Sequence, residues 1–148
     1  MSGYISASLR DRVTERAGGR CEYCGLAQLG QEATFHVDHA LPAVAGGPTT
    51  LENLALACVS CSLHKAARQT AVDSESGEEA PLFNPRIEHW ADHFQWRGFV
   101  LVGTSATGRA TIDALRMNRP LILAIREEEK LLGRHPPPGP GPKGLRPL

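Results

Sequence analysis

Two Cys-x-x-Cys pairs constrain the fold of this 148-residue chain more than any other feature of its sequence. The pairs are Cys21 with Cys24 and Cys58 with Cys61, and the chain has no other cysteine. Cysteines spaced in this way can turn both thiolates toward one ion, and four of them complete the tetrahedral shell that zinc prefers. Only 5% of the residues are aromatic, so a metal ion would help to stabilise a small core. We therefore predict a structural Zn²⁺ site with these four ligands.

Disulfide bonds are the alternative use of these cysteines. The first residues of the chain lack a basic segment followed by an apolar one, so they do not resemble a signal peptide. No run of about 18 apolar residues is present, which predicts that no helix crosses a membrane. We therefore expect a cytoplasmic protein. In a reducing compartment, paired Cys-x-x-Cys motifs are metal sites more often than disulfides.

The residues between the cysteine pairs predict a hairpin followed by a helix. Residues 33–38 alternate between apolar and polar side chains, which is typical of a half-buried strand with His36 and Asp38 on one face. Residues 54–57 form a short apolar run that fits a second strand. A helix is expected from near Val59 to about Thr70. Zinc would clamp these elements together.

The fold class that follows is α+β, with helices flanking the zinc-clamped unit. Apolar residues recur every four positions over residues 6–17, which predicts a helix before the zinc site. We predict four segments: residues 1–70 as the core with its amino-terminal helix and zinc site, 71–84 as an acidic surface loop, 85–134 as a helical or α+β extension packed on the core, and 135–148 as a disordered tail rich in Pro and Gly.

Four polar residues within this unit are not needed for zinc: Asp38, His39, Asn53 and His64. Hydrolysis of a phosphodiester requires a base that deprotonates water and positive charge near the phosphate. A neutral imidazole can accept the proton near pH 7. A carboxylate and a second imidazole can hold a Mg²⁺-type cation. These residue types favour a metal-dependent nuclease.

The order of the motifs resembles the HNH endonuclease family, which has the ββα-metal fold. The chain reads Val-Asp-His-Ala-Leu-Pro, then Gly-Gly, Leu-Glu-Asn-Leu and Cys-x-x-Cys-x-x-His-Lys, within about residues 20–66. The resemblance implies that His39 is the general base and that Asp38 and His64 bind a catalytic Mg²⁺ or Mn²⁺. It implies that Asn53 holds the loop and orients the base. It also implies cleavage of DNA with a 3′-hydroxyl and a 5′-phosphate as products.

A non-catalytic, zinc-stabilised nucleic-acid-binding module is the competing interpretation. Binding alone does not require a base beside a carboxylate, so the complete set of polar residues favours catalysis. RNA is a second alternative target, but the sequence contains no aromatic sheet motif of the kind that binds single-stranded RNA. The formal net charge of 0 neither supports nor excludes DNA. We expect double-stranded DNA as the partner, whereas the sequence indicates no oligomeric state and no protein partner.

Several further residues have two possible roles. His36 could face the catalytic cation beside Asp38, or could be a strand histidine with hydrogen bonds inside the fold. Lys65 and Arg68 could contact phosphates or form a solvated helix face. Arg86 and Arg109 of the extension are candidates for contact with DNA.

Overall fold

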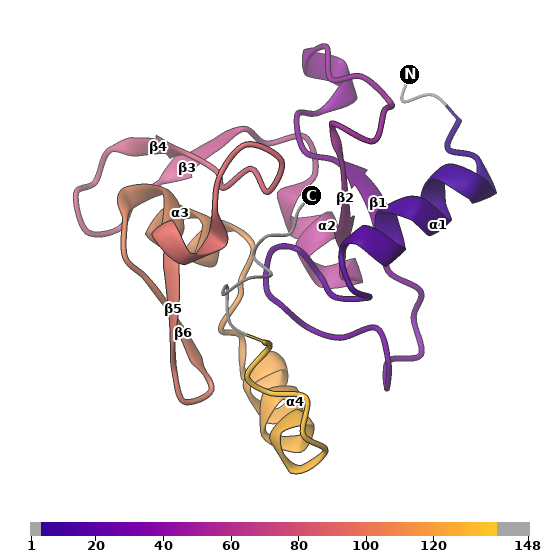
Figure 1. Cartoon of the computed structure of the whole chain (residues 1–148). Helices are drawn as coiled ribbons and strands as arrows, with labels where there is room; N and C mark the ends of the chain where they lie inside the picture. The colour runs from indigo at the N-terminus through magenta and orange to yellow at the C-terminus, as the bar shows by residue number, and fades with distance from the viewer. Residues whose placement is uncertain (1–3, 139–148) are drawn as a thin grey trace.

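The computed structural model describes residues 4–138 and has an α+β architecture, as the sequence predicts. Short antiparallel strand pairs alternate with helices along the chain (Figure 1). The elements are α1 (Ala7–Arg16), β1 (His36–His39), the 3₁₀ turn η1 (Ala43–Ala45), β2 (Leu54–Ala57), α2 (Val59–Lys65), β3 (Thr70–Val72), β4 (Glu79–Pro81), the 3₁₀ turn η2 (Trp90–Asp92), β5 (Phe94–Arg97), β6 (Val100–Gly103), α3 (Ala106–Ala114) and α4 (Pro120–Leu131).

The unit that contains β1, β2 and α2 follows the predicted order of a hairpin and a helix. Strands β1 and β2 pair antiparallel, with His36 opposite Ala57 and His39 opposite Leu54. All four residues of β2 are buried, because this strand lies between α1 and α2 in the core. Helix α2 ends at Lys65, earlier than the predicted limit near Thr70. The next residue, Ala66, has a φ of 49°, which is incompatible with a continuing right-handed helix.

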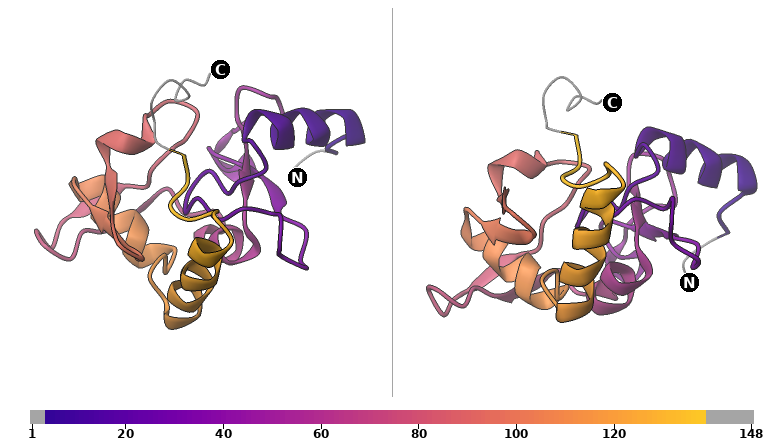
Figure 2. Two further views of the ribbon diagram at one scale, coloured as in Figure 1. Left: turned by 60° about the horizontal axis from the view of Figure 1, so that its bottom comes forward. Right: turned by 90° about the horizontal axis from the view of Figure 1, so that it is seen from below.

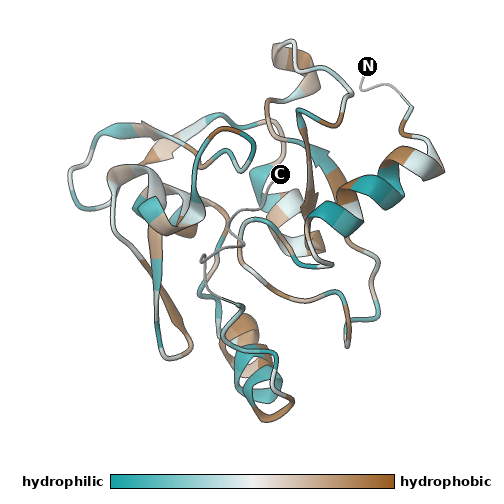
Figure 3. Cartoon of the chain, viewed as in Figure 1, coloured by the Kyte–Doolittle hydropathy of each residue, from teal (hydrophilic) through white to brown (hydrophobic). Residues whose placement is uncertain are grey.

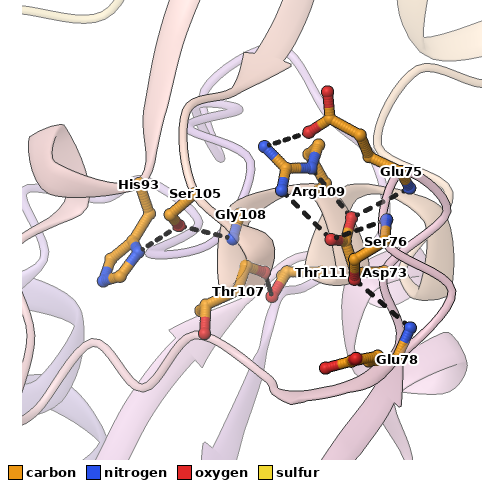
Figure 4. A network of polar contacts seen from close by, with 10 residues as sticks. All are labelled: Asp73, Glu75, Ser76, Glu78, His93, Ser105, Thr107, Gly108, Arg109 and Thr111. Carbon is orange, nitrogen blue, oxygen red and sulfur yellow. Dashed lines mark hydrogen bonds and ion pairs between the residues drawn. The ribbon is translucent and has the colours of Figure 1, made fainter.

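The segment predicted as an acidic surface loop contains the β3–β4 hairpin. Its first acidic residue, Asp73, is fully buried. Arg109 of α3 donates to both carboxylate oxygens of Asp73, from Nε at 2.8 Å and from Nη2 at 3.0 Å (Figure 4). The backbone N–H groups of Glu75 and Ser76 donate to the same carboxylate. These hydrogen bonds compensate the buried negative charge of Asp73. A polar segment can therefore form an ordered hairpin against α3.

Asp73→Asn should lower the melting temperature, because it removes the charge that compensates Arg109. The guanidinium of Arg109 holds the pKa of Asp73 well below its usual range. The pair therefore stabilises the folded state fully above the pKa of the unfolded chain, about 3.9, and less as the pH falls below it. Thermal melts should show a constant difference between wild type and variant from about pH 6 to pH 8.

Glu75→Gln is the matched control for this prediction. Glu75 contacts the same guanidinium at 2.8 Å, but its side chain is 69% exposed. Exposed ion pairs contribute little to stability, so this variant should melt near the wild-type temperature. Equal melting temperatures for Asp73→Asn and wild type would contradict the structural role of the pair.

The carboxyl-terminal part, residues 85–138, contains the hairpin β5–β6 and the helices α3 and α4. Helix α4 has apolar residues along one side and charged residues along the other (Figure 3). In the views of Figure 2 this helix lies between the β5–β6 and α3 region and the β1–β2–α2 unit. Arg126 of α4 is buried, and Nη1 donates to the carbonyl oxygen of Phe99 at 2.7 Å. The helix is thereby tied to the loop between β5 and β6.

Two side chains attach this carboxyl-terminal part to the loop of the first cysteine pair. Trp90 Nε1 donates to the carbonyl oxygen of Tyr23 at 2.8 Å. Arg86 forms an ion pair with Glu22 and donates to the carbonyl oxygen of Leu54 at 3.0 Å. Arg86, a candidate for contact with DNA, is therefore used inside the protein.

The predicted disordered tail begins with residues that the structure describes. His135 is 9% exposed, and its Nε2 lies 2.9 Å from the carbonyl oxygen of Gly98. Its ring lies edge-on to the ring of Trp96, with centroids 4.7 Å apart. The rest of the predicted tail, residues 139–148, lies outside the described residues. Within residues 4–138, no helix combines the length and the apolar character needed to cross a membrane.

Candidate functional site

The four cysteines form a buried cluster at the start of α2. Their sulfur atoms lie within 4.8 Å of one another. In each pair the backbone N–H of the second cysteine points at the sulfur of the first, at 3.4 Å for Cys24 to Cys21 and for Cys61 to Cys58. The two pairs thus have the same local geometry and face each other. A donor set of four sulfurs fits one tetrahedral ion and leaves no open position for a substrate.

Electrostatics within the cluster favour a cation. Burial raises the pKa of the Cys21 thiol. Hydrogen bonds from the neighbouring thiols, that of Cys21 first, hold the pKa of Cys58 well below its usual range. The surrounding thiols thus favour a thiolate at Cys58. A bound dication would stabilise the other thiolates in the same way.

Asp38 and His39 lie at the end of β1. Asp38 Oδ1 accepts from the backbone N–H of His39 at 3.1 Å. Its other oxygen, Oδ2, accepts from the Ser62 hydroxyl of α2 at 3.1 Å. The His39 ring is almost buried, and its Nε2 lies 2.9 Å from Thr49 Oγ1. Asp38 and His39 are thus adjacent in the strand, and each side chain bonds to a hydroxyl from another part of the chain.

Asn53 fixes the loop that leads away from His39. Its Oδ1 accepts from the backbone N–H of Leu41 at 2.9 Å, and its Nδ2 donates to the carbonyl oxygens of Leu41 and Pro48, both at 3.0 Å. Gly47 is required at this place, because a Cβ atom there would lie 1.8 Å from the Leu41 carbonyl oxygen. The two ends of the loop are therefore cross-linked by one amide side chain.

His64 lies on α2. Its Nδ1 donates to the carbonyl oxygen of Ser60, one turn earlier, at 2.8 Å. Its side chain lines an open cleft of about 380 Å³ beside α3 (lined by His64, Arg68, Ala71, Val72, Asp113, Ala114 and Arg116). Among the hydrogen bonds and ion pairs of the described residues, none joins His64 to Asp38 or His39. Hydrogen bonds thus join Asp38 to His39 and Asn53 to the loop after His39, whereas His64 bonds to its own helix.

Lys65 is a site residue whose position the sequence left open. It is 2% exposed, and its Nζ donates to the carbonyl oxygen of His39 at 3.0 Å. Burial lowers the pKa of Lys65, and the charge of Asp38 opposes this effect. The signal in the sequence is its spacing, because Lys65 follows the buried Cys61 by four residues and therefore shares its helix face. Ser62 is a further site residue, and it is not among those predicted from the sequence.

Comparison with known proteins gives one result. Residues 21–68, about a third of the chain, match the family model described as HNH endonuclease. The match includes both cysteine pairs and the whole β1–β2–α2 unit. No curated protein and no solved structure matches the chain.

Proposed function

Because residues 21–68 are an HNH endonuclease domain, we propose that the protein is a metal-dependent endonuclease that hydrolyses DNA phosphodiester bonds. The observation that carries the proposal is that Asp38 and His39 are adjacent at the end of β1, where the Asp38 carboxylate accepts from the backbone N–H of His39. Family membership links the chain to nuclease or nucleic-acid chemistry in general. A carboxylate and an imidazole at adjacent positions favour catalysis over binding alone, because binding does not need a general base.

His39 is the general base in this proposal. A neutral imidazole donates from one nitrogen and accepts at the other. If Nε2–H donates to Thr49 Oγ1 across their 2.9 Å contact, the lone pair lies on Nδ1, which can take a proton from water. Lys65 holds the backbone of His39 through its carbonyl oxygen. Asn53 fixes the loop that follows and in this way helps to orient the ring.

Asp38 is the residue whose chemistry fits a divalent cation best. Each of its oxygens accepts one hydrogen bond, and a carboxylate oxygen has a second lone pair that can face a metal ion. A bound Mg²⁺ or Mn²⁺ supplies positive charge for the scissile phosphate and for the leaving oxygen. The family resemblance adds His64 as a second ligand, although no hydrogen bond or ion pair among the described residues joins it to Asp38.

The cluster of Cys21, Cys24, Cys58 and Cys61 holds a structural Zn²⁺ in this proposal. The all-sulfur donor set and the complete burial of the cluster fit zinc rather than Mg²⁺ or Mn²⁺, which prefer oxygen ligands. The zinc ion would fix α2 against the loop of the first cysteine pair. It thereby fixes the position of Ser62 and Lys65 relative to β1.

Exposed cationic side chains near α2 would contact the DNA backbone. Lys65, Arg86 and Arg109 make ion pairs or hydrogen bonds inside the protein. Arg68 is exposed and lines the cleft beside α3 together with Arg116. Double-stranded DNA is the substrate that we propose, with its phosphates on this side of α2.

The experiment that tests the proposal is cleavage of a supercoiled plasmid by the zinc-loaded protein. With added Mg²⁺ or Mn²⁺ the plasmid should become open-circular or linear, and without the added ion it should stay supercoiled. Omitting the ion is a better control than a strong chelator, which would also remove zinc from the thiolates. Plasmid that is retarded on a gel but remains intact with every ion would support the non-catalytic binding module instead.

A further inference from the structure

One serine hydroxyl connects His36 and Asp38 beneath the hairpin. Ser62 Oγ donates to Asp38 Oδ2 at 3.1 Å and lies 2.9 Å from His36 Nδ1. His36 and Asp38 are two apart on β1 and share a face of the strand, and Ser62 comes from α2. Residues of two elements thus converge on one polar cluster at the proposed cation site. All three are partly exposed, so a metal ion from solvent can reach them.

The directions of these hydrogen bonds determine where the proton of His36 lies. The Ser62 hydroxyl has one proton, which it donates to Asp38. Its oxygen must therefore accept from His36 Nδ1–H. The neutral imidazole then has its lone pair on Nε2, free for a metal ion. Histidines that bind metals usually have this arrangement, with the second ring nitrogen donating to a polar group that sets the tautomer.

His64 is the competing source of a nitrogen ligand, and its surroundings are less suitable. Its Nδ1 also donates, to the Ser60 carbonyl oxygen, so its Nε2 has a lone pair as well. However, His64 lines a cleft whose charged residues are Arg68 and Arg116 against one acidic residue, Asp113. Like charges disfavour a divalent cation there. His36, in contrast, is linked to the Asp38 carboxylate through a single hydroxyl.

We propose that His36 is a ligand of the catalytic divalent cation together with Asp38, and that the Ser62 hydroxyl aligns the two side chains. The proposal rests on the nuclease function and specifies its metal site. It gives His36 a direct role in metal binding and makes Ser62 a positioning residue. His64 then belongs to the cleft beside α3 and is not a metal ligand.

The test uses Mn²⁺ as the probe and needs no DNA. The zinc-loaded full chain is titrated with Mn²⁺ by calorimetry, and pulsed electron paramagnetic resonance detects coupling of the bound Mn²⁺ to a histidine nitrogen. Wild type should show the nitrogen coupling. His36→Gln should lose the coupling and bind Mn²⁺ about tenfold more weakly or worse, as is typical when a metal site loses a supporting group. The matched control, His64→Gln, should retain both the coupling and the affinity.

Two further variants separate ligation from packing. His36→Asp restores an oxygen ligand, so it should bind Mn²⁺ better than His36→Gln while showing no nitrogen coupling. Ser62→Ala should keep the coupling but lose about tenfold or more in affinity, since it removes only the aligning hydroxyl. Zinc content and melting temperature, measured on each variant, show whether the fold is retained.

Three results would overturn the proposal: nitrogen coupling that persists in His36→Gln, nitrogen coupling that disappears in His64→Gln, or wild type that binds no Mn²⁺. The plasmid assay distinguishes this failure from failure of the nuclease function. Protein that cleaves plasmid with Mn²⁺ while His36→Gln keeps its coupling would refute the ligand assignment alone. A nitrogen-coupled Mn²⁺ site that depends on His36, in a protein that leaves plasmid intact, would support the metal site and refute the nuclease.

Discussion

Cys58→Ser should release zinc and abolish cooperative unfolding of the chain. Cys58 contributes one of the four clustered sulfurs, and its sulfur also accepts from the first turn of α2. Binding of structural zinc contributes about 10–16 kcal/mol in zinc-finger peptides, whereas a whole domain is stable by only about 5–15 kcal/mol. The remaining three sulfurs would hold zinc weakly. The loss therefore exceeds what the small core can compensate.

Zinc content by mass spectrometry and thermal unfolding by circular dichroism measure this effect. Leu63→Ser is the matched control, because it introduces the same residue into the same helix at a side chain that is 67% exposed. The control should contain one zinc ion per chain and melt near the wild-type temperature. A Cys58→Ser protein with full zinc content and an unchanged melt would show that the cluster is not a structural zinc site.

His39→Ala should lower the rate of plasmid cleavage by about 10²–10⁴-fold, the usual contribution of a general base. The loss should appear in the rate of the chemical step under single-turnover conditions, because the proton of the attacking water has lost its acceptor. The side chain is 7% exposed, so some loss of stability is also expected from the space that the ring leaves. The fold should persist, since zinc and the Asn53 contacts do not involve the imidazole.

Comparison with a second histidine separates catalysis from stability. His89 is exposed, precedes η2 and has no role in the proposed mechanism, so His89→Ala should cleave plasmid at the wild-type rate. Both variants should contain zinc and unfold cooperatively. If His39→Ala cleaves normally but melts at a much lower temperature, His39 is a structural residue and the proposed mechanism is wrong.

Local spacing is what made much of the fold predictable. The Cys-x-x-Cys pairs and the alternation around His36 and Asp38 are short-range patterns, and the α+β class with a hairpin followed by a helix came from them. The β3–β4 hairpin was missed because its stability depends on a partner far along the chain. Nothing in the segment around Asp73 indicates that Arg109 will neutralise a fully buried carboxylate.

The residues of the candidate site also divide into those that the sequence predicts and those that depend on distant contacts. Asp38, His39 and Asn53 could be selected by their chemistry, since a carboxylate, an imidazole and an amide fit distinct tasks. Ser62 could not, because serine is common on helix surfaces, and the inward orientation of Lys65 had only its spacing from Cys61 as a signal. Their contacts with Asp38 and His39 depend on how α2 lies against β1. The two cysteine pairs must come together in the fold before α2 takes this position against β1. No single motif of the sequence therefore predicts it.

The attachment of the carboxyl-terminal part to the first cysteine loop limits how the β1–β2–α2 unit can be transferred to another protein. A cassette restricted to residues 21–68 would lose the indole that donates to the Tyr23 carbonyl oxygen and the guanidinium that donates to Leu54. It would also expose the ring of Tyr23, which packs edge-on against Phe83. Fusion proteins built from this chain should therefore carry residues 4–138 as one transferable block.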